Sequence, residues 1–144
     1  MKRTLKVKRL YSDAVIPEYQ SPGAACFDLH SLDAFDIEPH TQGIVRTGLS
    51  FEVPVGHVML VYSRSGHGFK DRVSLSNCVG VIDSDYRGEV KVALRNDGHY
   101  WFSGAAGDRI AQAMLVAIPR VELHEIGELS MTERGSNGFG STGK

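Results

Sequence analysis

The chain has 144 residues, which is typical of one domain with its own core and short enough for a site to need a second subunit. Its net charge of −1 and pI near 6.6 argue against a nucleic-acid-binding surface, which usually carries a basic excess. No run of 18 apolar residues is found, so the sequence predicts no membrane partner.

Short alternating runs between frequent glycine and proline residues predict an all-β fold. Residues 2–10 read as a first strand rather than a signal peptide, and we therefore expect a cytoplasmic protein. Residues 121–124 alternate in the same way, whereas the apolar run 113–118 is typical of a strand covered on both faces. Many short strands with turns at this spacing predict a jelly roll or barrel, with at most one short helix within residues 65–70.

The cysteines and histidines show no metal-ligand spacing. Cys26 and Cys78 are far apart, and the sequence predicts small buried thiols rather than a disulfide or a zinc site. The six histidines form no H-E-x-x-H or similar motif. We therefore expect no catalytic metal held by protein ligands alone.

Two segments in the first half combine charged and small residues. Residues 24–29, AACFDL, place Asp28 between apolar neighbours, where a carboxylate is destabilising unless it has a partner. Residues 63–68, SRSGHG, place Arg64, a hydroxyl and backbone N–H groups at the start of the one predicted helix. We expect an anion site at this second segment.

Residues 80–90, GVIDSDYRGEV, are the most informative segment, and they predict a β-hairpin that leads into a half-buried strand. Asp83 follows two bulky apolar residues, so we expect its carboxylate at the rim of a packed layer, where it can take a proton from water. Tyr86 offers a flat face and a hydroxyl suited to packing against a sugar. The alternative is a solvated acidic turn, because turns favour aspartate for backbone reasons alone.

Residues 107–112, GDRIAQ, predict a turn followed by a buried strand. Asp108 and Arg109 are either a structural salt bridge or part of a site, and the sequence leaves both interpretations open.

The last fifteen residues differ from the rest of the chain. Residues 130–144 contain four glycines and leave the alternating pattern, so we expect a jelly-roll core over 1–129 and an arm that is mobile when nothing is bound. A frayed terminus is the simpler alternative. However, Arg134 offers a bidentate fork for phosphate and Phe139 a stacking face, which favours an arm that orders over a nucleotide.

In this order, the segments AACFDL, SRSG, GVIDSDYRGEV, GDRIAQ and RGSNGFGSTG resemble the five motifs of the trimeric deoxyuridine triphosphate nucleotidohydrolases, the dUTPases. The resemblance spans residues 24–143. It implies a distorted jelly-roll subunit of the β-clip type in a homotrimer, with active sites at subunit interfaces. The family hydrolyses dUTP to dUMP and pyrophosphate with Mg²⁺, which keeps uracil out of DNA and supplies dUMP for thymidylate synthesis.

The resemblance also implies a role for particular residues. Asp83 would orient and deprotonate the water that attacks the α-phosphorus, and Tyr86 would leave no room for a 2′-hydroxyl. Asp28 would contact the metal only through water, because the triphosphate and its waters hold most of the ion. The substrate contacts would be Asn77, Gly80, Val81 and Ile82 to uracil; Arg64, Ser65, Gly66 and Gln112 to the α- and β-phosphates; Arg134 to the γ-phosphate; Phe139 stacked on uracil; and Lys91, Gly140 and Ser141.

Two departures and two alternatives accompany the resemblance. Cys26 stands where the first motif most often has glycine, and Asn137 replaces the first of two paired arm glycines. Asparagine tolerates positive φ, so we expect the arm still to close. A dCTP deaminase on a related fold would need a glutamate where Ala93 stands. The alternative from another class is a trimer that senses a nucleotide or binds a partner protein without turnover.

Overall fold

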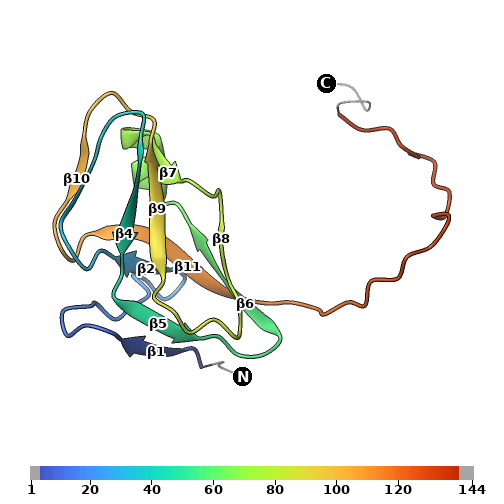
Figure 1. Cartoon of the computed structure of the whole chain (residues 1–144), viewed down its shortest axis with the longest axis horizontal. Helices are drawn as coiled ribbons and strands as arrows, with labels where there is room; N and C mark the ends of the chain where they lie inside the picture. The colour runs from blue at the N-terminus through green and yellow to red at the C-terminus, as the bar shows by residue number, and fades with distance from the viewer. Residues whose placement is uncertain (1–3, 140–144) are drawn as a thin grey trace.

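The computed structural model describes residues 4–139, and nearly all of its regular structure is antiparallel β-strand (Figure 1). One π-helical turn, η1, connects two strands, and none of the described helical structure is long and apolar enough to cross a membrane. The prediction of an all-β fold with at most one short helix is confirmed. The elements are β1 Lys6–Arg9, β2 Phe27–His30, β3 Phe35–Ile37, β4 Gln42–Arg46, β5 Leu49–Glu52, β6 His57–Tyr62, η1 His67–Asp71, β7 Val73–Leu75, β8 Gly80–Ile82, β9 Lys91–Asn96, β10 Phe102–Gly104 and β11 Arg109–Ala117.

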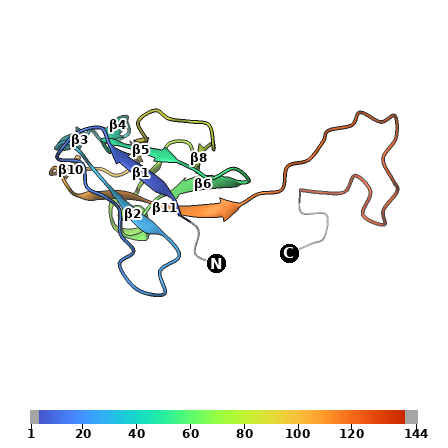
Figure 2. The same ribbon diagram turned by 90° about the horizontal axis from the view of Figure 1, so that it is seen from below.

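The strands form four antiparallel sheets. The largest has the order β2-β11-β6-β8, and a second has the order β4-β9-β7. The pairs β1-β5 and β10-β3 make up the other two. Figure 2 shows these strands gathered in one body, from which the chain departs at the end of β11.

The hydrophobic core follows the alternation in the sequence. In β9, Val92 and Leu94 are 2% and 1% exposed, whereas Lys91, the first residue of the strand, is exposed. Leu29 in β2 and Met59 in β6 are fully buried in the same cluster, so side chains of both larger sheets form one core. Burial of each such side chain stabilises the fold by roughly 1.5–3 kcal/mol.

Strands β8 and β9 do not form the predicted hairpin. β8 pairs with β6, whereas β9 pairs with β4 and β7. The hairpin prediction was wrong because the connection, residues 83–90, is anchored to a third strand instead of closing a tight turn. The Thr47 hydroxyl donates to the Val90 carbonyl at 2.6 Å, and the Val90 N–H donates to the Leu49 carbonyl at 2.8 Å. The connection thus crosses from one sheet to another.

The chain beyond β11 is an extended arm with no strand in its described part, residues 118–139 (Figures 1 and 2). The strand predicted at residues 121–124 is therefore absent, because no neighbouring strand pairs with its backbone. Leu123 is 91% exposed and Phe139 fully exposed. The run 113–118 also ends in exposed residues, so the prediction that both of its faces are covered fails at that end of the single chain.

Candidate active site

A pocket of about 360 Å³ lies where β8 passes into the connection to β9. It combines apolar walls with two carboxylates and an ammonium group, as a site for a small charged ligand requires. Five of the residues predicted from the sequence meet here. The lining residues are Val81, Ile82, Asp83, Tyr86, Glu89, Val90 and Lys91.

The connection that carries Asp83 is braced against the body by polar contacts. The Ser50 hydroxyl donates to the Arg87 carbonyl at 2.6 Å. The Glu89 carboxylate is largely buried and pairs with Nε of Arg46 at 3.2 Å. Asp83 itself is exposed at the rim, as the sequence predicts, and its carbonyl closes the local turn. The carboxylate is therefore open to water on a loop whose position is fixed.

Tyr86 is held by its own loop. Its hydroxyl donates to the Glu89 carbonyl at 3.0 Å. A Cβ atom at Gly88 would lie 2.6 Å from Cζ of Tyr86, so only glycine permits this close packing. Tyr86 as a whole is 44% exposed and lines the pocket, so it is accessible to a ligand there.

A second group of predicted residues surrounds Asp28 in β2. Its buried carboxylate lies 3.4 Å from Nε of Arg64 and 3.4 Å from Nη1 of Arg109. These guanidinium groups are the partners that a buried carboxylate needs. Gln112 of β11 lies opposite Asp28 in the ladder, and its amide donates to the Ser63 carbonyl at 3.0 Å.

The residues beside the Asp28 group bear on two predictions, the anion site at residues 63–68 and the salt bridge between Asp108 and Arg109. Ser65 and Gly66 are exposed just before η1, but η1 is one short turn, so a helix dipole gives little support to the anion site predicted here. The Asp108 carboxylate accepts from the Ala105 N–H at 2.8 Å and is not the ion-pair partner of the arginine that follows it.

Asp83 and Arg64 lie at opposite ends of the β6-β8 pair. Ile82 is opposite Met59, so Asp83 follows at the end where β6 begins, whereas Arg64 follows Tyr62 at the other end. The span from Met59 to Tyr62 alone is about 10 Å at the usual rise of a strand. Within one chain, the Asp83 carboxylate and the Arg64 guanidinium therefore lie beyond opposite ends of the β6-β8 pair.

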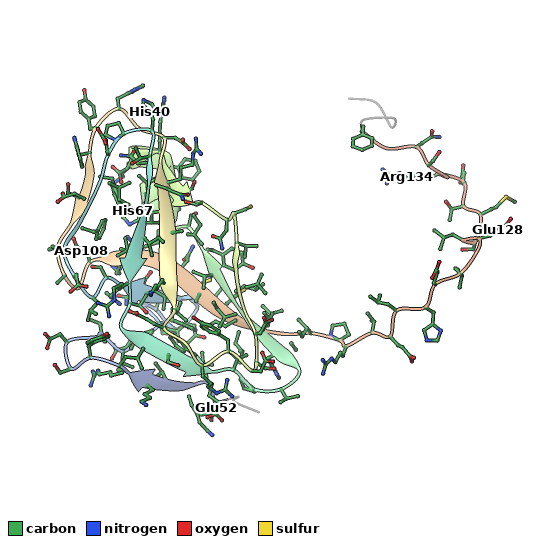
Figure 3. The ribbon with its side chains drawn as sticks, viewed as in Figure 1. His40, Glu52, His67, Asp108, Glu128 and Arg134 are labelled. Atoms are coloured by element: carbon green, nitrogen blue, oxygen red, sulfur yellow. The ribbon has the colours of Figure 1, made fainter. Side chains whose placement is uncertain are left out.

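The arm residues are far from both groups. Figure 3 shows Arg134 on the extended segment, away from the body, and its Nε donates to the Asn137 carbonyl at 2.8 Å. Positive φ falls on Phe139 rather than on Asn137, so the expected conformational role of this asparagine is not seen in the extended arm. The predicted contacts Gly140 and Ser141 lie outside the described residues.

The turn before β8 holds a further predicted contact and a correction. Asn77 is exposed, and its side-chain amide lies close to Gly80. Cys78 is exposed at φ 64°, so the prediction of a buried thiol is wrong for it. Cys26 is half-buried, and burial, reinforced by the nearby Asp28 charge, raises the pKa of its thiol. Neither thiol forms a disulfide.

The donor set fits a magnesium ion that is held mainly by substrate. Residues 4–139 contain no cluster of three or more acidic, histidine or cysteine side chains able to hold a metal. Mg²⁺ commonly keeps several waters and uses one or two carboxylates together with phosphate oxygens. Asp28, already paired with two guanidinium groups, can accept a hydrogen bond from a metal-bound water but cannot supply a coordination shell.

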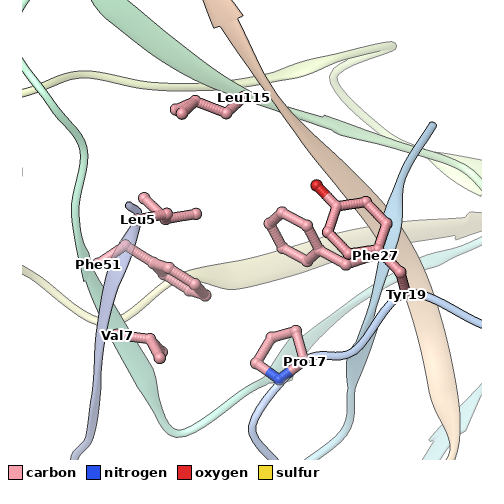
Figure 4. A pocket seen from close by; sticks show the side chains of 7 residues that line it. All are labelled: Leu5, Val7, Pro17, Tyr19, Phe27, Phe51 and Leu115. Atoms are coloured by element: carbon pink, nitrogen blue, oxygen red, sulfur yellow. The ribbon is translucent and has the colours of Figure 1, made fainter. Parts of the chain in front are cut away.

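An apolar pocket of about 250 Å³ lies elsewhere on the body (Figure 4). No charged side chain lines it, so it does not suit a phosphate-bearing ligand. Its lining residues are Leu5, Val7, Pro17, Tyr19, Phe27, Phe51 and Leu115.

The surroundings of His30, at the end of β2, lead us to expect that the stability of the fold depends on pH. Nδ1 of this histidine is buried and has no hydrogen-bond partner among the described residues. Burial lowers the pKa of the imidazole; Asp28 opposes this shift, whereas Arg109 and Arg64 add to it. The folded state therefore favours neutral His30, and the resulting stability is present above the ordinary pKa and is lost as pH falls through the lowered one.

We expect acidification from pH 7.5 to pH 5 to lower the urea midpoint more in the wild type than in His30→Asn, at one fixed protein concentration. Parallel pH dependences of the two midpoints would contradict the assignment.

Two residues near these groups carried no signal that singled them out in the sequence. Glu89 lines the pocket and braces its loop. His67 lies 3.1 Å from Nη1 of Arg64. Glu89 pairs with Arg46, and His67 also contacts the Arg109 carbonyl; these partners are 43 and 42 positions away in the sequence, which local residue spacing cannot reveal.

The similarity to known proteins extends over nearly the whole chain. The family model of the dUTPases matches residues 12–143. A deoxyuridine 5′-triphosphate nucleotidohydrolase of Nautilia profundicola is 46% identical, and the match covers 97% of this chain and 99% of that protein. The Wolinella succinogenes protein of the same name is 44% identical over 99% of this chain and 96% of its own.

Solved structures show the same fold. A variant of the Staphylococcus bacteriophage 80alpha dUTPase with dUpNHpp has a TM-score of 0.92 and 28% identity over 99% of this chain and 100% of that one. A variant of the phage phi11 dUTPase, 25% identical with a TM-score of 0.81, covers 88% of this chain and 98% of its own and shows the coordination of a structural Mg(II) ion. The five motifs, the mostly-β fold and these matches agree, and the chain belongs to the dUTPase family.

Proposed function

We propose that this chain hydrolyses dUTP to dUMP and pyrophosphate. The observation that carries the proposal is the pocket in which Asp83 and Tyr86 lie beside Val81 and Ile82, in a chain of the dUTPase family. The complex of the 80alpha dUTPase with dUpNHpp supports binding of a nucleotide of this kind.

Asp83 acts as the general base. Its carboxylate takes a proton from a water molecule, and the water oxygen attacks the α-phosphorus. The bond from this phosphorus to the bridging oxygen breaks, and pyrophosphate leaves with the bonding electrons. Positioned proton transfer of this kind contributes on the order of 10² to 10⁴ in rate. A bound Mg²⁺ would neutralise charge on the phosphates, with Asp28 in contact through water.

Recognition of the base and the phosphates falls to different residues. The backbone of residues 80–82 and the amide of Asn77 pair with the uracil edge. Cytosine has the opposite donor and acceptor there, so the unpaired polar groups would reject it by about 10⁴-fold or more. The α- and β-phosphates are held by Arg64, Ser65, Gly66 and Gln112, and Lys91 contacts the substrate from the pocket.

The complete site is assembled in a homotrimer. The separation of the Asp83 pocket and the Arg64 group within one chain supports this assembly, because the α-phosphate must lie beside both the water that Asp83 activates and the Arg64 guanidinium. Exposed apolar side chains on the arm support it as well, since they have no partner in the described chain. Residues 1–129 form the catalytic core together with the first part of the extended segment, and residues 130–144 of another subunit close over the nucleotide, with Arg134 on the γ-phosphate and Phe139 on uracil.

A substrate panel tests the proposal. Purified protein is incubated with dUTP, dCTP, dTTP and UTP, with and without Mg²⁺, and released pyrophosphate and ammonia are measured. We expect pyrophosphate from dUTP only, and only with Mg²⁺. Ammonia from dCTP would indicate a deaminase, although Ala93 in β9 offers no carboxylate for proton transfer. Nucleotide binding without release of pyrophosphate would indicate a sensing or partner-binding trimer.

Replacing Tyr86 with alanine should admit UTP, because the ring that occupies the space of a 2′-hydroxyl is lost. We expect the preference for dUTP over UTP, measured as the ratio of kcat/KM values, to fall by about tenfold or more. Tyr86→Phe keeps the ring and loses only the hydrogen bond to Glu89, so it should still refuse UTP. An undiminished preference for dUTP over UTP in the alanine variant would show that Tyr86 does not exclude the 2′-hydroxyl.

A further inference from the structure

We propose that His67 is a positioning residue that holds the Arg64 guanidinium ready for the substrate phosphates; the inference rests on the proposed function. His67 is the first residue of η1, and its side chain is only 18% exposed. Its ring packs edge-on against Phe102, with 5.0 Å between ring centroids. Figure 3 shows His67 on the body, on the same side as Asp108 and far from the arm.

The hydrogen-bonding role of His67 follows from its distances. Nε2 lies 2.8 Å from the Arg109 carbonyl oxygen and 3.1 Å from Nη1 of Arg64. Two acceptors would repel each other at 2.8 Å, so Nε2 carries a hydrogen and donates to the carbonyl. Nη1 of Arg64 donates to the same oxygen at 3.3 Å. His67 and Arg64 are therefore two donors that share one acceptor.

The Arg109 carbonyl lies at an irregularity in the pairing of β11. The register of β11 against β2 shifts between Arg109 and Ala111, and bulges commonly redirect groups beside active sites. This carbonyl accepts from side chains. On the other side of the guanidinium, Nε of Arg64 faces the Asp28 carboxylate at 3.4 Å.

This arrangement fixes one part of the guanidinium and leaves another free. Nε and Nη1 of Arg64 have partners, whereas Nη2 makes no hydrogen bond to another residue within 4–139. Its two N–H groups remain for a phosphate. His67 lies against Nη1 and is itself held by Phe102 and by Asp71, whose Oδ2 is 3.5 Å from Nδ1. Because His67 is a donor to the same oxygen, it acts on Arg64 through the Arg109 carbonyl, and removing His67 would free this carbonyl, which accepts from Nη1 of Arg64.

The expected effect is on binding rather than on the chemical step. Ordering one long side chain on binding weakens affinity by about 3- to 10-fold. We therefore expect His67→Leu, which keeps the bulk against Phe102, to raise KM for dUTP by about this factor while kcat changes less than about twofold. Affinity for deoxyuridine, which has no phosphate, should be unchanged.

Two amide variants separate the donor from the packing. Glutamine can place its amide nitrogen near the position of Nε2, whereas asparagine is too short. We expect His67→Gln to restore the wild-type KM and His67→Asn to behave like His67→Leu. His99→Leu, at an exposed histidine in the β9-β10 connection, serves as the control and should leave both constants unchanged.

An unchanged KM in His67→Leu, or a glutamine variant no better than asparagine, would overturn the inference. A fall in kcat and melting temperature at constant KM would indicate a purely structural role and would overturn it too. Calorimetry with inorganic tripolyphosphate keeps the test independent of turnover. If the wild type does not hydrolyse dUTP, weaker tripolyphosphate binding in the leucine and asparagine variants, restored by glutamine, still supports positioning, and equal binding contradicts it.

Discussion

Replacing Asp83 with asparagine should lower kcat for dUTP by on the order of 10² to 10⁴, because the amide cannot accept the proton of the attacking water. The substitution keeps the size of the side chain at the pocket rim, so the pocket should keep its shape. We therefore expect the affinity for dUpNHpp, measured by calorimetry, to change by less than about threefold. Loss of turnover with retained binding separates a chemical role from a binding role.

Asp85 provides a matched control in the same turn. It is an exposed carboxylate two residues away, and it does not line the pocket. Asp85→Asn removes the same charge from the loop, and we expect its kcat to stay within about twofold of the wild type. Equal losses in the two variants would show that the charge of the turn matters rather than a proton acceptor at position 83, and unchanged turnover in Asp83→Asn would refute the base assignment.

Ending the chain after Leu129 should leave a folded protein that has lost most of its activity. The last strand ends at Ala117, and the described hydrogen bonds of the removed segment stay within the arm, so melting temperature should shift by only a few degrees. Loss of the Arg134 contact to phosphate and of Phe139 stacking should lower kcat/KM by about 10²-fold or more.

The double variant Arg134→Ala and Phe139→Ala tests whether these two side chains account for the loss. It keeps the arm at full length and should reproduce most of the effect of truncation. A truncated protein with normal kcat/KM would show that the arm takes no part in the reaction.

Local chemistry made much of the site predictable from the sequence. Asp28 stands between apolar neighbours, and a buried carboxylate requires cationic partners, which the structure supplies. The alternation of β9 predicted which of its side chains are buried, because strand faces alternate with a period of two. Asp83 and Tyr86 share a pocket because they share one short turn.

Long-range pairing could not be predicted in the same way. The hydrophobic pattern of residues 80–82 indicates a strand, but it does not say whether that strand pairs with β9 or with β6. The alternation of residues 121–124 also indicates a strand, yet a strand exists only where another backbone pairs with it. His67 contacts the Arg109 carbonyl, 42 positions away, beside a register shift of β11 that the hydrophobic pattern does not reveal.

Mixing two inactive variants tests the central claim, that the Asp83 carboxylate and the Arg64 guanidinium of different chains serve one site. Asp83→Asn and Arg64→Ala are each prepared alone, then unfolded and refolded together in equal amounts, and dUTP turnover is measured. Random assembly of a symmetric trimer predicts recovery of about one quarter of the wild-type activity, because about one site in four receives both native residues. Activity that stays at the level of the separate variants would contradict the account, because it would mean that both residues must come from one chain.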